Sequence, residues 1–286
     1  MNRNRFQEDV VVFSKSPNRL RLLFALQALV KQLLENDIEL VRPCRTACLM
    51  MLSGLSSNSL PDELLSRVFV EQHEDGGWVG PDDSMWALLF LKLAGLSTTE
   101  SFSKGISFLH NQRSNDFGWG RSERDIPRIP VTGRILHFLP EVCREDYIDA
   151  LLRLWTCERN SLTYKASFTL AAAHTAGMLP TSSPLVLETI QWLGSQQNID
   201  GGFSPWKGHP VGSDIYCTAI ALTGLLQYPC ETTQNVVTNG LAWMAEKQLS
   251  NGLWAYHQIE DGAAWGLYAT YLAHRVASEY HAGPAS

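Results

Sequence analysis

Apolar residues cluster in short stretches of helical length, and glycine-rich turns separate these stretches. This pattern predicts units of one helix, a turn and a second helix. Four such units can be delimited, with the first helix before the turn and the second after it: 64–71 and 84–93, 103–111 and 131–139, 185–195 and 216–226, and 238–247 and 263–276.

The four turns share one motif, which runs from a Gln to an aromatic residue. Asp or Asn stands three residues after the Gln, and Gly and the aromatic residue follow. The copies span 72–78, 112–119, 197–203 and 248–254. Asp or Asn next to Gly favours a turn. We expect the Gln to bond backbone groups around the turn and the aromatic residue to pack across to the neighbouring unit.

The spacing of the motifs predicts two further units. The motifs start at Gln72, Gln112, Gln197 and Gln248, so the middle interval is about twice the others. A degenerate unit is expected near 157–160, ahead of a helix over 164–173. Another precedes Gln72, with helices in 16–35 and 45–55. Such self-similarity is the signature of a repeat architecture.

Six helix pairs would fill the chain, and the predicted fold is therefore all-α: an α/α toroid, a six-fold barrel of helix hairpins. We expect one domain over 1–286, with the first 15 or so residues flexible. An open superhelix of helix pairs is the alternative.

Composition narrows the functional classes. The net charge is −6, and no basic face indicates a nucleic-acid partner. No apolar stretch reaches the ~20 residues of a membrane span, and the polar start does not resemble a secretory signal. The six cysteines form no paired CxxC motif, which excludes a zinc ribbon. We expect a cytoplasmic protein with free thiols, no transmembrane segment and no resident metal.

The second helices of the units, aligned by their apolar pattern, predict where chemistry takes place. Asp82 falls opposite Asp214 and Asp261, and Trp86 falls opposite Thr218 and Trp265. If these helices start at one mouth, acids lie at the rim of a cavity and aromatic residues one turn deeper. Aromatic faces stabilise cations, and burial keeps an acid protonated.

The motif Q-x-x-D-G-G-W followed by an Ala-rich helix resembles the repeat of squalene and oxidosqualene cyclases, class II diterpene cyclases and protein prenyltransferase β subunits. The resemblance covers about 64–276. It implies an α/α barrel whose inner helices line a cavity for an isoprenoid substrate.

The stretch from Asp214 to Ala219 is similar to two motifs of that superfamily. In the cyclase acid motif D-x-D-D-T-A, the middle Asp is the proton donor; here Tyr216 takes its place and Cys217 replaces the last Asp. In the prenyltransferase motif D-x-Y-H-T, Cys217 replaces a zinc-binding His. The other zinc ligands of that family form D-x-C in the preceding unit, and 160–164 lacks this pair.

These observations favour a small terpene cyclase-like enzyme, of class II type with a degenerate acid motif. It would cyclise or isomerise a prenyl or prenylated substrate through acid-initiated carbocation chemistry. We expect a small hydrophobic isoprenoid partner and no cofactor, with Mg²⁺ needed only if the substrate is a diphosphate. The alternatives are a zinc-dependent prenyltransferase β-like subunit, a non-catalytic lipid-binding barrel and a non-terpenoid cyclase.

The candidate site follows from the alignment and the resemblance. The predicted catalytic residues are Asp214, Tyr216, Asp82 and Asp83. The predicted substrate-binding residues are Cys217, Thr218, Trp86, Trp265, His209, His257 and Asp261. Three of the acids, Asp82, Asp214 and Asp261, precede predicted helices, so helix N-caps are their structural alternative. The alternative for Cys217, Trp86 and Trp265 is core packing.

Overall fold

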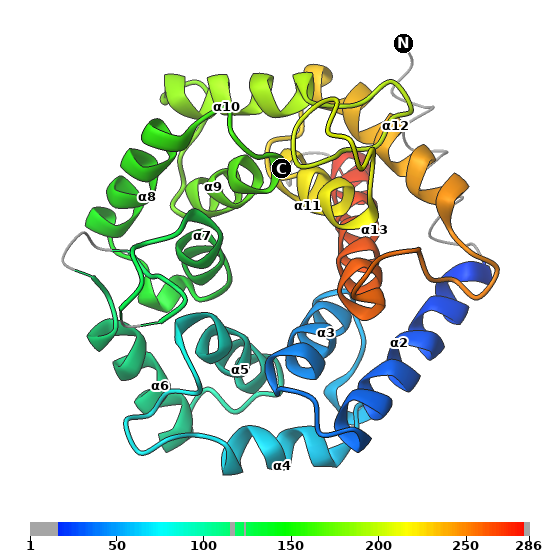
Figure 1. The fold of residues 1–286 in the computed structure, drawn as a ribbon. Coiled ribbons are helices and arrows are strands. Elements are labelled where there is room, and N and C mark those ends of the chain that lie inside the picture. Colours follow the sequence, from blue (N-terminus) through cyan, green and yellow to red (C-terminus); the bar gives the residue numbers. More distant parts are fainter. Residues whose placement is uncertain (1–16, 115–117, 123, 283–286) are drawn as a thin grey trace. The chain divides into compact units, whose positions relative to one another are not determined.

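The computed structural model describes residues 17–114, 118–122 and 124–282. Within these residues there are twelve α-helices, which pair in chain order into six helical hairpins (Figure 1). They are α2 (Pro17–Glu35), α3 (Val41–Leu52), α4 (Asp62–Val70), α5 (Pro81–Leu93), α6 (Glu100–Asn111), α7 (Ile129–Phe138), α8 (Glu145–Glu158), α9 (Thr163–Thr175), α10 (Pro184–Ser195), α11 (Ile215–Leu225), α12 (Glu231–Lys247) and α13 (Ile259–Ala282). The expectation of a flexible start concerns residues that lie outside the described part.

The predicted helices are all present, but most of them begin earlier than the apolar pattern indicates, and in two of them this changes the place of a predicted acid. Helix α5 starts at Pro81, with Gly80 as its N-cap, and α13 starts at Ile259. Asp82 and Asp261 therefore lie inside the first turns of helices, and the N-cap interpretation of these two acids is wrong. Asp214 does cap α11, because its carboxylate accepts a hydrogen bond from the Cys217 main-chain N at 2.8 Å.

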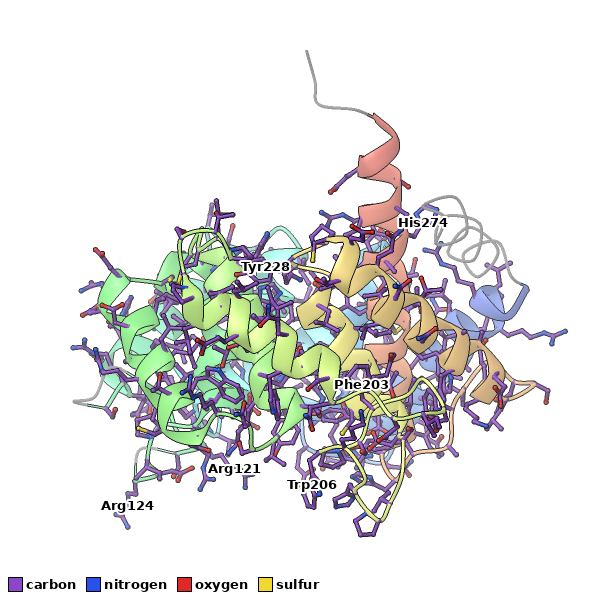
Figure 2. The ribbon with its side chains drawn as sticks, turned by 90° about the horizontal axis from the view of Figure 1, so that it is seen from above. Arg121, Arg124, Phe203, Trp206, Tyr228 and His274 are labelled. Carbon is purple, nitrogen blue, oxygen red and sulfur yellow. The ribbon has the colours of Figure 1, made fainter. Side chains whose placement is uncertain are left out.

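The described chain forms two compact units. Unit 1 comprises 17–26, 160–170 and 179–282, and unit 2 comprises the described residues of 27–159 together with 171–178. In unit 2, α5 packs against α3, α6 and α7, and α7 packs against α8. In unit 1, α11 packs against α10, α12 and α13. Figure 2 shows Phe203 and Trp206 toward one end of unit 1 and Tyr228 and His274 toward the other.

The motif turns are held by their Gln and acidic side chains, as predicted. The Gln72 amide nitrogen donates to the carbonyls of Gly76 and Ser101, both at 2.8 Å. The Asp75 carboxylate accepts from the Gly77 main-chain N at 2.9 Å. The turn at 197–203 repeats this pattern, with Gln197 bound to Gly201 and Val236 and Asp200 bound to Gly202.

Glycine is required at one position of these turns because the backbone is left-handed there. The φ angle is +91° at Gly76, +91° at Gly201 and +87° at Gly252. In the degenerate unit Asn160 takes this conformation with φ +63°, between α8 and α9. Asn tolerates the left-handed region better than most residues. The hidden unit predicted near 157–160 is therefore confirmed as a helix, turn and helix.

The aromatic residue of each motif bonds one or both helices of its unit. The indole nitrogens of Trp78, Trp119 and Trp254 donate to carbonyls of the preceding helix, at 2.7–2.9 Å. The main-chain N of the aromatic residue donates to a hydroxyl in the following helix in three units: Trp78 to Ser84, Trp119 to Thr132 and Phe203 to Thr218, at 2.8–2.9 Å.

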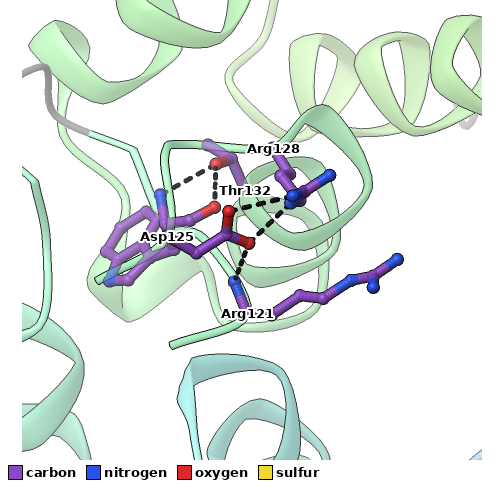
Figure 3. Close-up of polar contacts among 5 residues, drawn as sticks. Arg121, Asp125, Arg128 and Thr132 are labelled. Atoms are coloured by element: carbon purple, nitrogen blue, oxygen red, sulfur yellow. Dashed lines mark hydrogen bonds and ion pairs between the residues drawn. The ribbon is translucent and has the colours of Figure 1, made fainter. Parts of the chain in front are cut away.

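Figure 3 shows this bond before α7, beside a second clasp of the same loop. The Asp125 carboxylate accepts from the Arg128 guanidinium at 2.6 and 2.9 Å and from the Arg121 main-chain N at 3.0 Å. These hydrogen bonds lower the pKa of Asp125 to about 2, with that from Arg128 the largest cause. Hydrogen bonds therefore hold this loop at two places, between Trp119 and Thr132 and around Asp125.

Thr218→Val tests whether the hydroxyl bond supports the fold. Thr218 is fully buried, so the variant leaves the Phe203 N–H without its acceptor. We expect the free energy of unfolding to fall by about 1–3 kcal/mol, measured by urea denaturation. The matched control is Thr223→Val in the same helix. Its hydroxyl bonds only the Ala219 carbonyl at 2.9 Å, so its loss should cost less. Equal losses in both variants would contradict the assigned role.

None of the described helices combines the length and the apolar character that crossing a membrane requires.

Candidate functional site

Unit 1 contains a cavity of about 710 Å³ at the start of α11. This volume falls within the range of about 300–1,000 Å³ that is typical of small-molecule sites. Its walls include five large aromatic side chains and the first turn of α11. The aromatic residues are Tyr164, Tyr216, Trp243, Trp254 and Tyr256. The cavity therefore offers mostly aromatic surface, with few charged groups.

Four of the predicted site residues line this cavity: Asp214, Tyr216, Cys217 and His257. The Tyr216 ring lies parallel to the Tyr256 ring, with an interplanar angle of 5° and centroids 5.6 Å apart. His257 packs beside Tyr256 on the other side, with centroids 4.2 Å apart. The Tyr216–Tyr256 pair is thus a preformed aromatic wall.

Burial and neighbouring acids keep the cavity's weak acids protonated. Burial raises the pKa of the Cys217 thiol well above its usual value, and Asp214 raises it further. The pKa of Tyr256 is raised by burial, and then by Tyr216, Asp214 and Asp261. A protonated Cys217 behaves as a small buried group rather than as a thiolate ligand.

The other predicted residues of unit 1 lie behind or beside the cavity. Thr218 and Trp265 are buried, with Thr218 bound to the Phe203 backbone and Trp265 packed edge-on against Phe168. Asp261 is 6% exposed. His209 packs edge-on against Trp206 and accepts from the Val211 main-chain N. None of these four residues lines the cavity, and their predicted role in substrate binding stays a prediction.

Asp82 and Asp83 lie in unit 2, in the first turn of α5. The Asp82 carboxylate accepts a hydrogen bond from the Arg134 guanidinium of α7 at 2.7 Å. The side chain of Arg134 is 9% exposed and that of Asp82 is 23% exposed. Arg134 and Asp82 therefore form an ion pair that joins α7 to the first turn of α5.

Asp83 has the opposite electrostatic environment. Burial raises its pKa, the neighbouring Asp82 charge raises it further, and the result is about 6. Arg45 of α3 acts in the other direction and lowers it. When two adjacent carboxyl groups have different electrostatic environments, one of them can act as the proton-donating acid beside the other. Asp83 is the member of the pair that can hold a proton near neutral pH.

Aromatic side chains follow this pair along α5 and α7. Trp86, one turn after Asp82, is fully buried and packs on Phe138 with ring centroids 5.6 Å apart. The thiols of Cys44 and Cys48 in α3 donate to the Trp86 carbonyl, at 3.3 and 3.4 Å. These cysteines therefore support the backbone of α5 beneath the acids.

The hydrogen bonds from the motif aromatic residues to Ser84 and Thr218 show how α5 and α11 align, and this alignment differs from the one predicted from the apolar pattern. Ser84 and Thr218 make the same bond to a motif aromatic residue, and each stands four residues after its helix N-cap, Gly80 or Asp214. Asp82 therefore corresponds to Tyr216 and Asp83 to Cys217. The predicted match of Asp82 with Asp214 is wrong by two residues, because the loops before α5 and α11 differ in length.

The sequence did not reveal Arg134, His137 or Tyr256. Arg134 and His137 lie three residues apart on α7, which is otherwise apolar from Ile129 to Phe138. The sequence signal that could have identified them is the presence of an Arg and a His in a helix that is otherwise predicted to be buried. Tyr256 lies next to His257 in the loop before α13, and nothing in its spacing distinguished it.

Among the described residues, no three His, Cys, Asp or Glu side chains gather closely enough to hold a metal ion. Cys217 has Asp214 beside it and no third ligand in that part of the chain. The zinc-dependent alternative has no ligand set there.

The chain was compared with family models, curated proteins and solved structures. No family model matches the chain. Among curated proteins, protostadienol synthase A of Arthroderma gypseum is 28% identical over 107 residues, and lanosterol synthase of Candida albicans is 34% identical over 108 residues. The squalene–hopene cyclase of Zymomonas mobilis is 30% identical over 111 residues.

Among solved structures, the type II terpene cyclase MstE from Scytonema superposes with a TM-score of 0.70 at 16% identity. The match covers 91% of this chain and all of that one. An MstE variant in complex with geranylgeranyl dihydroxybenzoate, its substrate, gives a TM-score of 0.69. This likeness confirms the predicted all-α fold of the α/α-barrel class.

Over part of its length the chain is similar to oxidosqualene and squalene–hopene cyclases, and it shares the fold of a type II terpene cyclase. The curated matches cover 34–36% of this chain and only 14–16% of those relatives. Within the superfamily's acid motif D-x-D-D-T-A, the corrected register gives the two central acids a match in α5. Asp82, Asp83 and Ser84 occupy the helix positions that Tyr216, Cys217 and Thr218 occupy in α11.

Proposed function

We propose that this protein is a class II-type terpene cyclase that cyclises or isomerises a prenyl or prenylated substrate, with Asp83 as the proton donor. The observation that carries this proposal is the Asp82–Asp83 pair of α5, in which Asp82 is ion-paired with Arg134 and Asp83 has a pKa of about 6. The curated relatives and the MstE fold support the reaction class.

The proposed reaction begins when the Asp83 carboxyl group transfers its proton to a carbon–carbon double bond or an epoxide of the substrate. The product of this step is a carbocation next to an Asp83 carboxylate. Burial and the neighbouring Asp82 charge disfavour the ionised form of Asp83, so the carboxyl group keeps its proton until the substrate accepts it. The positive charge of the new carbocation then compensates the negative charge left on Asp83.

In this proposal the residues of α11 have a supporting role. Asp214 caps the helix, and Tyr216 with Tyr256 forms the wall of a cavity suited to a hydrophobic ligand. Of the four residues predicted to be catalytic, this proposal keeps Asp82 and Asp83 in that role and gives Asp214 and Tyr216 structural roles.

The direct test is incubation of the purified protein with a panel of substrates. The panel contains geranylgeranyl dihydroxybenzoate, squalene, oxidosqualene and prenyl diphosphates, each with and without EDTA. We expect a cyclised or isomerised product from at least one member. We expect no loss of rate with EDTA for members without a diphosphate. A panel that is recovered unchanged would contradict the proposal.

A further inference from the structure

The ring of His137 is fixed in one orientation by α9. Its Nδ1 lies 2.9 Å from the Thr175 hydroxyl oxygen. That hydroxyl has a single proton, which it donates to the Ala171 carbonyl at 3.0 Å. The Thr175 oxygen is then left to accept, so Nδ1 carries the proton and Nε2 is the basic ring nitrogen.

His137 lies about one helical turn along α7 from the residue that binds Asp82. It stands three residues after Arg134, the residue that binds Asp82, so the two side chains are neighbours on the helix surface. The rise between them is about 4.5 Å along the axis. The ring also packs on Phe138, with centroids 4.6 Å apart, and Phe138 packs on Trp86. Ring contacts therefore run from His137 through Phe138 to Trp86, which lies one turn after Asp82 in α5.

The imidazole is neutral and half-buried. The residues on either side of it in α7 are buried, whereas His137 keeps part of its surface. Burial lowers the pKa of His137 to about 4, and His174 lowers it further, against a hydrogen bond to the Ala171 backbone that raises it. A neutral ring has a lone pair to offer and adds no positive charge that would repel a carbocation.

We propose that His137 is the base that ends the reaction, an inference that rests on the proposed cyclase function. Its Nε2 removes a proton from a carbon next to the final carbocation. The electrons of the broken C–H bond form the new carbon–carbon double bond, and His137 becomes an imidazolium. That imidazolium then releases its proton to water, and Asp83 takes one up from water, so the cycle consumes no proton.

The test variant is His137→Asn, whose amide can keep the Nδ1-like hydrogen bond to Thr175 but has no counterpart of Nε2. The probe is the panel member that the wild type converts. We expect the share of the wild-type alkene among the products to fall at least about tenfold. Isomeric alkenes and alcohols formed by water capture should replace it, because Asp83 still starts the reaction. His110→Asn in α6, which removes another histidine with a lowered pKa, should keep the wild-type products.

A second measurement does not depend on turnover. Nitrogen-15 NMR of histidine-labelled protein should show the His137 proton on Nδ1, and Thr175→Val should weaken this preference. A proton on Nε2 in the wild type would overturn the proposal, as would wild-type products from a folded His137→Asn. If the wild type converts no panel member, the proposed function fails and this inference fails with it. If Asp83→Asn stops conversion while His137→Asn changes nothing, only this inference fails.

Discussion

Asp83→Asn is expected to abolish conversion of the substrate while making the protein more stable. Asn has nearly the same shape but no acidic proton, so the rate should fall by about 10²–10⁴-fold, the usual contribution of a general acid. Rates would be measured by chromatography of the products. The control is Asp214→Asn, in which Asn can still cap α11, and it should stay within a few-fold of the wild type.

The gain in stability follows from the raised pKa. In the folded protein the Asp83 carboxylate costs free energy above pH 6, because its pKa lies at about 6 rather than 3.8. Two pKa units correspond to roughly 3 kcal/mol, and partial solvent contact reduces this to about 2 kcal/mol. Well below pH 3.8 the group is protonated in both the folded and the unfolded state. The variant should therefore be more stable than the wild type at pH 7.5 and equal to it at about pH 2.5.

Urea denaturation at the two pH values checks this. The wild-type rate should also fall about tenfold for each pH unit above 6, since only the protonated acid can act. An Asp83→Asn protein that keeps its activity, or that loses stability at pH 7.5, would remove Asp83 from the mechanism.

Arg134→Met is expected to cause the largest loss of stability at the site. It leaves the Asp82 carboxylate, which is 23% exposed, without its cation. Removing one partner of a buried ion pair costs about 3–5 kcal/mol, and the residual exposure of Asp82 places the expected loss at about 3 kcal/mol. Urea denaturation at pH 7.5 measures it.

A double-mutant cycle separates the ion pair from packing. Asp82→Asn combined with Arg134→Met should recover more than half of the lost stability, because no uncompensated charge remains. Arg134→Lys, which keeps the charge and loses the fork geometry, should lie between the wild type and Arg134→Met. If the losses in the two single variants simply add in the double variant, Arg134 does not stabilise Asp82.

The hairpin architecture could be predicted from the sequence because its signals are local. Gly76, Gly201 and Gly252 mark left-handed turns, and the motif Gln side chains bond their own turns, with Gln72 and Gln197 also reaching the next repeat. Even the degenerate unit followed from the interval between Gln112 and Gln197, although Asn160 replaces its Gly.

The site could not be predicted to the same extent because its register depends on loop length. The motif aromatic residue and its hydroxyl partner are 6 residues apart before α5, 13 before α7 and 15 before α11. An apolar pattern does not reveal such differences, so Asp82 was compared with Asp214 instead of Tyr216. Asp82 in α5 and Arg134 in α7 are 52 residues apart in the sequence. No local sequence pattern therefore predicts their ion pair.

The central claim is that an enzyme acid protonates a substrate carbon, and deuterium incorporation tests it most directly. The wild type is incubated in D₂O with geranylgeranyl dihydroxybenzoate, or with the panel member that it converts. Mass spectrometry and NMR then locate carbon-bound deuterium in the product. The account predicts one deuterium at the carbon that starts the cyclisation, and none of this product from Asp83→Asn. A product without carbon-bound deuterium would contradict it.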